Sequence, residues 1–319
     1  MPQATFPRIS VIVPAYNVAH DIEPAIDTLL NQSKPFFEII IVNDGSTDST
    51  LARLRKYEAL ARMHVIHSEN QGLGAARNTG VTRAHGDFIC FFDADGLLSP
   101  MFVETISAAL TKDSTLDLIF FSGETFLDLR SEFSPDYNRE IVGNFSSGME
   151  AFSALLEMDS FEPHAYMYVS RRCKWGPGKL KFPPIIHEDE AVILNVCVAA
   201  SGTVVLADKL YRRTIRANSI VTSPLGTRSM NGAFKAFIAT AEVWRSRRDL
   251  RPTYPRQVRR RLNTLLEMYL DKCIQLQVFP KVFSVVPAYA RLRLRPPIMA
   301  MVPSILPSWA IRFIRKKKG

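Results

Sequence analysis

Apolar, β-rich runs alternate with amphipathic stretches four times in the first hundred residues of this 319-residue chain, and this alternation constrains the fold most strongly. The runs that we predict as strands are residues 8–13, 38–42, 65–66 and 89–92. Continuously apolar runs such as the second suit strands buried on both faces of a parallel sheet. Right-handed crossovers bring the polar loops that follow such strands to one edge. The sequence therefore predicts an α/β domain with a mainly parallel central sheet and a ligand crevice at that edge.

Two carboxylates one residue apart follow the fourth predicted strand. Asp93 and Asp95 come directly after the apolar run 89–92, and Gly96 stands behind them. Residues two apart along an extended chain share a face, so both carboxylates can point at one hard cation such as Mg²⁺ or Mn²⁺. A turn at Asp95-Gly96 beside a solvated Asp93 explains the same residues. Taken alone, this pair leaves both interpretations open.

The positive charge of the chain is concentrated in its last part. The net charge is +9, yet residues 272–319 contain ten Lys or Arg and no Asp or Glu, whereas residues 1–271 contain 30 basic and 31 acidic residues. A basic tail on a neutral body favours a polyanionic partner, either an anionic membrane surface or nucleic acid. Four separated cysteines without a CxxC pair and the lack of an export-signal layout in residues 1–8 predict a cytoplasmic location.

Four segments in the predicted crevice resemble one known family. They are Val11-Ile12-Val13-Pro14-Ala15-Tyr16-Asn17, Val42-Asn43-Asp44-Gly45-Ser46-Thr47-Asp48, Gly74-Ala75-Ala76-Arg77-Asn78 and Phe92-Asp93-Ala94-Asp95. In order and spacing over residues 8–100 they are similar to the GT-A-type family 2 glycosyltransferases, such as the bacterial enzymes that build surface polysaccharides. The acidic segment 187–190 and the arginine-containing stretch 211–220 extend the resemblance to about residue 220. We therefore expect a GT-A (nucleotide-diphospho-sugar transferase) fold.

The resemblance implies roles for residues in the first four loops. The residues that would hold the base and ribose of a nucleotide are Pro14, Tyr16, Asp44 and Arg77. Asp93 and Asp95 would bind the ribose and a divalent cation on the diphosphate, with Mg²⁺ or Mn²⁺ as the cofactor. Asn43 and Gly96 stand where many relatives carry Asp. Asn43 keeps a hydrogen-bond acceptor at its position, whereas Gly96 removes a possible third acid.

The acidic segment 188–190 precedes the apolar stretch 191–200, which we predict as a helix. Acids at the start of a helix favour its macrodipole, so the segment alone indicates a capped helix. Beside the upstream motifs, the resemblance implies that Asp189 is the general base of a transfer that inverts the anomeric centre. Weaker candidates on the acceptor or phosphate side are Glu188, Trp175, Arg212 and Arg213.

These weaker candidates have ordinary structural explanations as well. Trp175 can stack on a sugar ring or pack in the core. Arg212 and Arg213 can clamp a phosphate or belong to the plain surface.

The domain organisation follows from changes in composition along the chain. We predict a GT-A catalytic domain over residues 1–222, with a nucleotide-binding half at about 8–100 and an acceptor half at about 101–222. A helical appendix follows over residues 223–280, and a basic, proline-rich tail occupies residues 281–319. The apolar part of the tail has four prolines and fewer than about 20 residues, so it suits an anionic membrane surface better than a membrane span.

Together with these features, the resemblance implies a metal-dependent inverting glycosyltransferase in surface polysaccharide biosynthesis. Its partners would be a nucleotide-sugar donor, by resemblance a UDP-sugar, and a saccharide acceptor, for which a lipid-linked form suits the tail. We expect a peripheral position on the inner face of the plasma membrane and no nucleic acid partner, since no recognition motif is visible. The alternatives are a nucleotidyltransferase, disfavoured because the loop 14–17 has no Gly or basic residue, and a non-catalytic membrane-associated binding protein.

Overall fold

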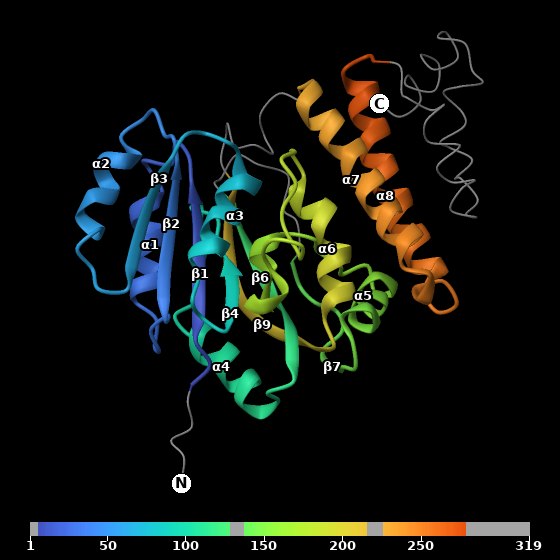
Figure 1. Ribbon diagram of the computed structural model, residues 1–319, viewed down its shortest axis with the longest axis horizontal. Helices are drawn as coiled ribbons and strands as arrows, with labels where there is room; N and C mark the ends of the chain where they lie inside the picture. Colours follow the sequence, from blue (N-terminus) through green and yellow to red (C-terminus); the bar gives the residue numbers. More distant parts are fainter. Residues whose placement is uncertain (1–5, 128–136, 216–225, 279–319) are drawn as a thin grey trace. The chain divides into compact units, whose positions relative to one another are not determined.

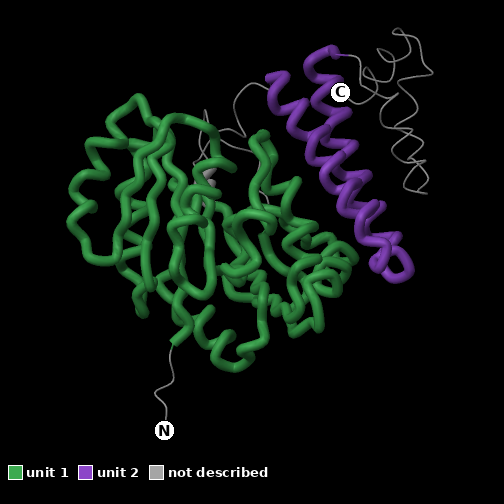
Figure 2. The backbone as a smooth tube through the Cα atoms, in the orientation of Figure 1, with its two compact units in different colours: residues 1–223 green, residues 224–319 purple. Residues whose placement is uncertain are grey.

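The computed structural model describes residues 6–127, 137–215 and 226–278 (Figure 1). The chain divides into two compact units, residues 1–223 and residues 224–319 (Figure 2). Residues 218–220, the end of the arginine-containing stretch that extends the resemblance, lie outside the described residues, as does the basic tail 281–319. The subdivision into catalytic domain, helical appendix and tail stays a prediction about how the chain is organised.

The first unit contains one mixed sheet with the strand order β3-β2-β1-β4-β8-β6-β9-β5, and β7 pairs with β9. The strands are β1 (Ile9–Ala15), β2 (Glu38–Asp44), β3 (Met63–Ser68), β4 (Phe88–Phe91), β5 (Gly96–Leu98), β6 (Leu116–Leu127), β7 (Gly143–Phe145), β8 (Tyr168–Arg171) and β9 (Gly202–Ile215). The longest ladders, β1–β2, β2–β3 and β6–β9, are parallel. Strand β8 is antiparallel to both of its neighbours, β4 and β6. The predicted α/β class with a mainly parallel sheet is confirmed.

Helices alternate with the strands of this unit (Figure 1). They are α1 (Ile22–Leu30), α2 (Thr50–Leu54), α3 (Leu73–Arg83), α4 (Phe102–Lys112), α5 (Gly148–Glu157) and α6 (Glu188–Ala199). Every residue of β1 and β2 is buried, as their continuous apolar runs predict. Helix α1 adds Ile22, Ile26 and Leu29 to the core of the sheet. The resulting core fixes the carboxyl ends of β1, β2 and β4, where the conspicuous polar residues stand.

Some elements of the first unit were not predicted from the sequence. Helix α2 ends at Leu54 and continues only as a 3-10 turn over Arg55–Tyr57, and Leu60 beyond it is 41% exposed. Strand β6 runs to Leu127. Helix α5 had no predicted counterpart, although the Ser147 side chain caps it by accepting a hydrogen bond from Glu150 N. The spacing of Ser147 and Glu150 is the sequence signal that could have identified its start.

The described part of the second unit is a pair of helices. Helix α7 (Thr227–Ser246) and helix α8 (Pro255–Gln275) lie side by side and are joined through a 3-10 turn, η4 (Arg248–Leu250). The predicted helical character of the C-terminal appendix is confirmed by these two helices. Among the described residues, no helix combines the length and apolar character that crossing a membrane requires.

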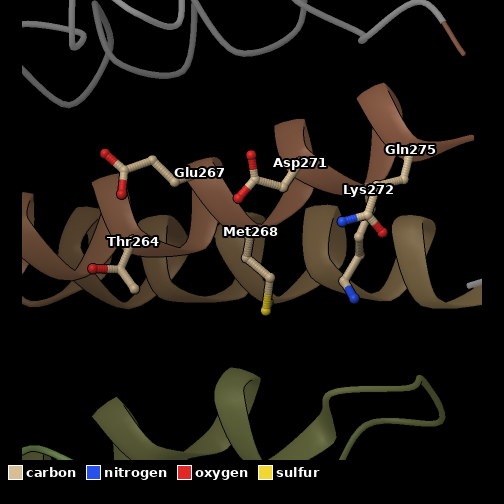
Figure 3. A pocket seen from close by; sticks show the side chains of 6 residues that line it. All are labelled: Thr264, Glu267, Met268, Asp271, Lys272 and Gln275. Carbon is tan, nitrogen blue, oxygen red and sulfur yellow. The ribbon is translucent and has the colours of Figure 1, made fainter. Parts of the chain in front are cut away.

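A shallow hollow runs along the flank of α8. It is lined by Thr264, Glu267, Met268, Asp271, Lys272 and Gln275 (Figure 3). These residues come from successive turns of a single helix, and the described part of the chain shows no group of side chains converging there. Burial lowers the pKa of Lys272 below its ordinary value. The hollow therefore lacks the concavity of a ligand site.

Candidate active site

Three loops at the carboxyl ends of β1, β2 and β3 are tied together by polar side chains. Asn17 Oδ1 accepts a hydrogen bond of 2.8 Å from Thr47 N, which joins the first loop to the second. Asp44 accepts from the backbone nitrogens of Gln71 and Gly72, at 2.9 and 2.8 Å, which joins the second loop to the third. The crevice predicted from strand alternation is therefore built from loops that hold one another in place.

The residues predicted to hold the nucleotide differ in accessibility. Pro14 is buried in β1, and Asp44 is 3% exposed with both carboxylate oxygens accepting backbone hydrogen bonds. Tyr16, just beyond the end of β1, is 47% exposed. An exposed aromatic ring beside a polar loop is a suitable stacking surface for a base. Contacts of Pro14, Tyr16 and Asp44 with a nucleotide stay predictions.

Arg77 is fully enclosed by the fold. Its side chain, on α3, is 1% exposed and lies between two carboxylates. Arg77 Nη2 is 2.7 Å from Asp93 Oδ1, and Nη1 is 2.5 Å from Glu188 Oε1. The guanidinium also lies over the ring of Phe182, and its carboxylate neighbours raise its pKa against the opposing effect of burial. The guanidinium is enclosed and bonded to two carboxylates, while its Nε has no hydrogen-bond partner among the described residues. A contact of Arg77 with the nucleotide stays a prediction.

The Arg77 bridge brings distant parts of the sequence together. Asp93 follows β4, whereas Glu188 opens α6, 111 residues beyond Arg77. Burial raises the pKa of Glu188 to about 7, although the charge of Arg77 opposes that rise. Glu188 is therefore a buried partner of Arg77, and its predicted role on the acceptor side stays a prediction. One buried cation fixes the end of β4 against the start of α6.

Asp93 and Asp95 lie beside each other after β4, as the spacing predicts. Gly96 N donates a hydrogen bond of 2.9 Å to Asp93 O, so the pair is held in a turn. Burial, together with the nearby charge of Asp93, raises the pKa of Asp95 to about 6. Such mutual repulsion between two carboxylates is relieved by a hard divalent cation. These residues fit Mg²⁺ or Mn²⁺, although the described residues contain no cluster of three His, Cys, Asp or Glu side chains.

Tyr211 explains why position 96 is glycine. A Cβ added at Gly96 would stand 2.1 Å from the Tyr211 hydroxyl oxygen, far inside contact distance. Tyr211 is 1% exposed, packs at the edge of Phe92 and has no hydrogen-bond partner for its hydroxyl among the described residues. A side chain at position 96 has no room, because β9 places a tyrosine ring in that space.

This contact predicts the effect of a single methyl group. Gly96→Ala should lower the free energy of unfolding of the first unit by about 1–3 kcal/mol, because the added Cβ overpacks against Tyr211. The matched variant Tyr211→Phe, which removes a hydroxyl without a described partner, should change stability by less than about 1 kcal/mol. Urea denaturation followed by circular dichroism measures both. A Gly96→Ala protein as stable as the wild type would contradict the contact.

Asp189 lies in the first turn of α6 and is partly accessible. Its side chain is 17% exposed, and its Oδ2 is 3.2 Å from Nδ1 of His164. Its Oδ1 accepts a hydrogen bond of 2.8 Å from Glu190 N. Burial alone would raise the pKa of Asp189, but the hydrogen bond and charge of His164, with the charge of Arg77, outweigh burial and lower it. The carboxylate is therefore ionised at neutral pH and open enough for a ligand to reach.

The two neighbouring arginines of β9 lie in different surroundings. Arg213 Nη1 donates to the Tyr137 hydroxyl at 2.6 Å, and its guanidinium lies 5.9 Å from the Tyr166 ring centroid. Its positive charge also acts on Asp95, and it is the register partner of Gly96. Arg212, in contrast, is 50% exposed and pairs with Glu124 at 2.6 Å. The structure therefore brings Arg213 to the carboxylate pair and leaves Arg212 in a surface ion pair.

Trp175 belongs to the core. It is 5% exposed, and its ring packs against Phe91 and Phe182 at centroid distances of 5.2 and 5.1 Å. Its Nε1 donates a hydrogen bond of 2.9 Å to Ser170 Oγ. Of the two explanations left open for Trp175, packing in the core describes its surroundings, and a contact with a sugar stays a prediction. The sequence around Trp175 gives no sign of whether its ring packs in the core or stacks on a sugar.

Sequence reasoning missed His164 and Tyr166, and it gave no role to Tyr211 within the stretch 211–220. The rings of His164 and Tyr166 stack at 5.0 Å, and those of Tyr166 and Tyr211 stack at 4.4 Å. His164 stands 25 residues before its partner Asp189. No periodic pattern or spaced motif links these positions, so their proximity depends on how β9 and the turn before β8 meet in the sheet.

Comparisons with known proteins agree on one family. Residues 10–149 match glycosyl transferase family 2. The chain is 40% identical over 224 residues to the uncharacterized glycosyltransferase EpsJ of Bacillus subtilis, an alignment covering 68% of this chain and 64% of EpsJ. It is 44% identical over 91 residues to the putative teichuronic acid biosynthesis glycosyltransferase TuaG of Bacillus subtilis, covering 28% of this chain and 36% of TuaG. The chain thus spans less than two thirds of these relatives.

Solved structures share the fold. The S. aureus TarS 1-349 structure in complex with UDP-GlcNAc superposes with a TM-score of 0.61 at 19% identity, covering 89% of this chain and 88% of that one. The mannosyltransferase PcManGT from Pyrobaculum calidifontis, in complex with GDP-Man and Mn²⁺, gives a TM-score of 0.58 at 17% identity, covering 91% and 79%. The expected GT-A fold is confirmed. Residues 10–149 therefore match glycosyl transferase family 2, and the chain shares the fold of these solved structures.

Proposed function

We propose that the protein is a metal-dependent, inverting glycosyltransferase that moves a sugar from a nucleotide-diphosphate donor to a saccharide acceptor in polysaccharide biosynthesis. The observation that carries this proposal is the Arg77 bridge, which holds the carboxylate pair after β4 and the acidic start of α6 in one assembly. A transferase of this kind needs charge stabilisation on the leaving diphosphate and a base for the acceptor hydroxyl. The carboxylate pair on one side of the bridge would stabilise the leaving diphosphate through a cation, and Asp189 at the start of α6 would be the base. A UDP-sugar is the donor that we propose.

The donor side of the site is Asp93, Asp95 and Arg213. When bound, Mg²⁺ or Mn²⁺ would neutralise negative charge on the leaving diphosphate. Asp93 and Asp95 are the residues that would hold it, and two carboxylates supplemented by substrate oxygens are a usual arrangement for these ions. Arg213 adds a fixed positive charge beside Asp95. Tyr16 offers its exposed ring to the base of the nucleotide.

The acceptor side of the site is Asp189. Its lowered pKa makes it an ionised but weak base, so it accepts the hydroxyl proton as the bond from acceptor oxygen to anomeric carbon forms and the hydroxyl becomes acidic. Attack from the face opposite the leaving diphosphate inverts the anomeric centre. Positive charge that develops on the sugar ring, as in glycoside hydrolysis, lies among the carboxylates of the site.

Donor binding tests the proposed carboxylate pair. Calorimetry with UDP in the presence of Mn²⁺ should detect binding to the wild type and a loss of at least about tenfold for Asp95→Asn, which removes one of two anionic cation ligands. Asp27→Asn is the matched control, because it removes the same charge from an exposed position on α1. Equal affinity in the Asp95→Asn protein would count against a cation at this pair.

The different surroundings of Arg213 and Arg212 predict different effects on UDP binding when each is replaced by Gln. Arg213→Gln should weaken UDP binding about 10- to 100-fold, because a charge-assisted hydrogen bond is worth about 1.5–3 kcal/mol. Arg212→Gln, which removes only an exposed ion pair, should leave affinity within about twofold. Calorimetry measures affinity, and thermal unfolding checks that loss of the Tyr137 hydrogen bond has not unfolded Arg213→Gln. Equal effects of the two substitutions would contradict the assignment.

The identity of the acceptor and the cellular location of the protein are also part of this proposal. A lipid-linked saccharide on the inner face of the plasma membrane would suit the basic tail, residues 281–319, which lies outside the described residues. TarS bound to UDP-GlcNAc and PcManGT bound to GDP-Man support a nucleotide-sugar donor through their shared fold. The nucleotidyltransferase alternative has no observation in its favour, since the loop after β1 has no glycine or basic residue for a triphosphate.

A further inference from the structure

The imidazole of His164 lies between two carboxylates. Its Nδ1 is 3.2 Å from Asp189 Oδ2, and its Nε2 is 3.4 Å from Glu162 Oε2. The three side chains are 28%, 17% and 25% exposed, so the chain of contacts is screened from bulk water without being sealed. An ionised carboxylate only accepts hydrogen bonds, so the nitrogen that faces Asp189 must carry the proton. His164 is therefore a hydrogen-bond donor to the proposed base.

Two tyrosines fix the plane of this imidazole. The ring of Tyr166 stacks on it at 5.0 Å with an interplanar angle of 5°, and Tyr137 approaches at 5.9 Å and 77°, edge to face. Tyr166 stacks in turn on Tyr211 at 4.4 Å, and the Tyr211 hydroxyl lies against Gly96. Because the ring cannot tilt freely, the directions of Nδ1 and Nε2 are set by the fold. The aromatic stack is continuous from the donor-side turn to the histidine.

Asp189 depends on His164 for its orientation. The hydrogen bond to its Oδ1 comes from the next residue of its own helix, Glu190 N, and belongs to the local backbone. The hydrogen bond to its Oδ2 comes from an imidazole 25 residues away. A local backbone contact leaves rotation of the carboxylate possible, whereas a second donor at a fixed distance selects one orientation. Buried or partly buried charged groups with two fixed donors are well ordered.

We propose that His164 is a positioning residue for sugar transfer: its Nδ1–H holds Asp189 in the orientation that receives the acceptor proton, and Glu162 holds the opposite ring nitrogen. The inference rests on the proposed function, in which Asp189 is the base. His164 itself contacts neither the sugar nor the diphosphate in this account. A carboxylate displaced by about 1 Å can cost about a hundredfold in rate, so orientation alone can matter greatly.

Two substitutions separate the hydrogen bond from the ring. His164→Phe keeps an aromatic ring against Tyr166 but removes both nitrogen contacts. His164→Asn removes the ring but places an amide N–H donor at the position of Nδ1. We expect His164→Phe to lower kcat for transfer about 10- to 100-fold with the donor KM within about twofold of wild type. His164→Asn should recover kcat to within about fivefold of the wild type.

The reverse ranking would overturn the proposal. If His164→Phe is active and His164→Asn is not, the ring packs against its neighbours and the hydrogen bond is irrelevant. Glu162→Gln, which keeps a hydrogen-bond acceptor for Nε2 through its amide oxygen, should change kcat less than His164→Phe. Circular dichroism confirms that each variant is folded before its rate is compared.

A second measurement does not depend on transfer activity. Carbon-13 NMR titration of the Asp189 carboxyl should show a higher pKa in His164→Phe than in the wild type, because His164 lowers that pKa. Arg77 and His187, the other positive groups acting on Asp189, and Glu188, its acidic neighbour, are unchanged in this variant. An unchanged pKa would contradict the His164 contact. A wild-type protein without transfer activity but with the expected shift would contradict the proposed function and leave the contact established.

Discussion

Asp189→Asn should lower kcat for sugar transfer by about 10²- to 10⁴-fold while UDP and donor affinities stay within about twofold of wild type. General-base catalysis contributes an effect of this size. Asparagine keeps the shape of the side chain and can still accept a hydrogen bond from His164, but it cannot take up the proton of the acceptor hydroxyl. Steady-state kinetics with a saccharide acceptor and calorimetry with UDP measure the two quantities.

Glu190→Gln is the control for this variant. It removes the same charge one residue further along α6, where the side chain is also partly buried. Its kcat should stay within about fivefold of the wild type. An equal loss in both variants would mean that negative charge at the start of α6, rather than a base at Asp189, supports the reaction.

Arg77→Met should lower the free energy of unfolding of the first unit by about 3–5 kcal/mol, the cost of leaving buried ionised partners uncompensated. Asp93 and Glu188 would each lose a direct contact to the guanidinium. Methionine fills part of the same volume, so the loss reflects charge more than packing. Urea denaturation measures the change in stability, and donor affinity should fall in parallel because Asp93 is no longer held.

Arg8→Met provides the comparison for a surface ion pair. Arg8 bonds to Asp87 at 2.8 Å with both side chains more than 40% exposed, at 48% and 44%. Exposed pairs are worth about 0–1 kcal/mol, so this variant should be nearly as stable as the wild type. Adding Glu188→Gln to Arg77→Met should restore part of the lost stability, since one buried charge is then removed. Equal stability of Arg77→Met and Arg8→Met would contradict the buried bridge.

The parallel half of the fold could be predicted because its signals are local. The apolar runs of β1 and β2 and the buried face of α1 depend only on neighbouring residues. Strand β8 could not be predicted in the same way. It has four residues, and it pairs with β4 and β6, far away in the sequence, in antiparallel register. Short strands inserted between distant partners leave no periodic pattern for sequence analysis to detect.

The candidate site also combines residues with local sequence signals and contacts between distant parts of the chain. Asp93, Asp95 and Asp189 could be singled out because each belongs to a compact motif that the resemblance identifies. The surroundings of these residues could not be predicted from the sequence. The contacts made by Arg77 and His164 join residues that are 111 and 25 positions apart in the chain. Arg77 was assigned to the nucleotide because its motif stands in a ligand loop. Its burial between two acids follows from tertiary packing, which no motif records.

The most direct test of the account is transfer from a panel of nucleotide sugars to saccharide and membrane-extracted acceptors, with Mn²⁺, with Mg²⁺ and with a chelator. The account predicts that one donor releases its nucleoside diphosphate only when a divalent cation is present. It also predicts that the sugar appears on an acceptor with inverted anomeric configuration. Transfer that persists undiminished in chelator would contradict the metal site, and a retained configuration would contradict Asp189 as base. The absence of binding and turnover for every donor would contradict the proposed function as a whole.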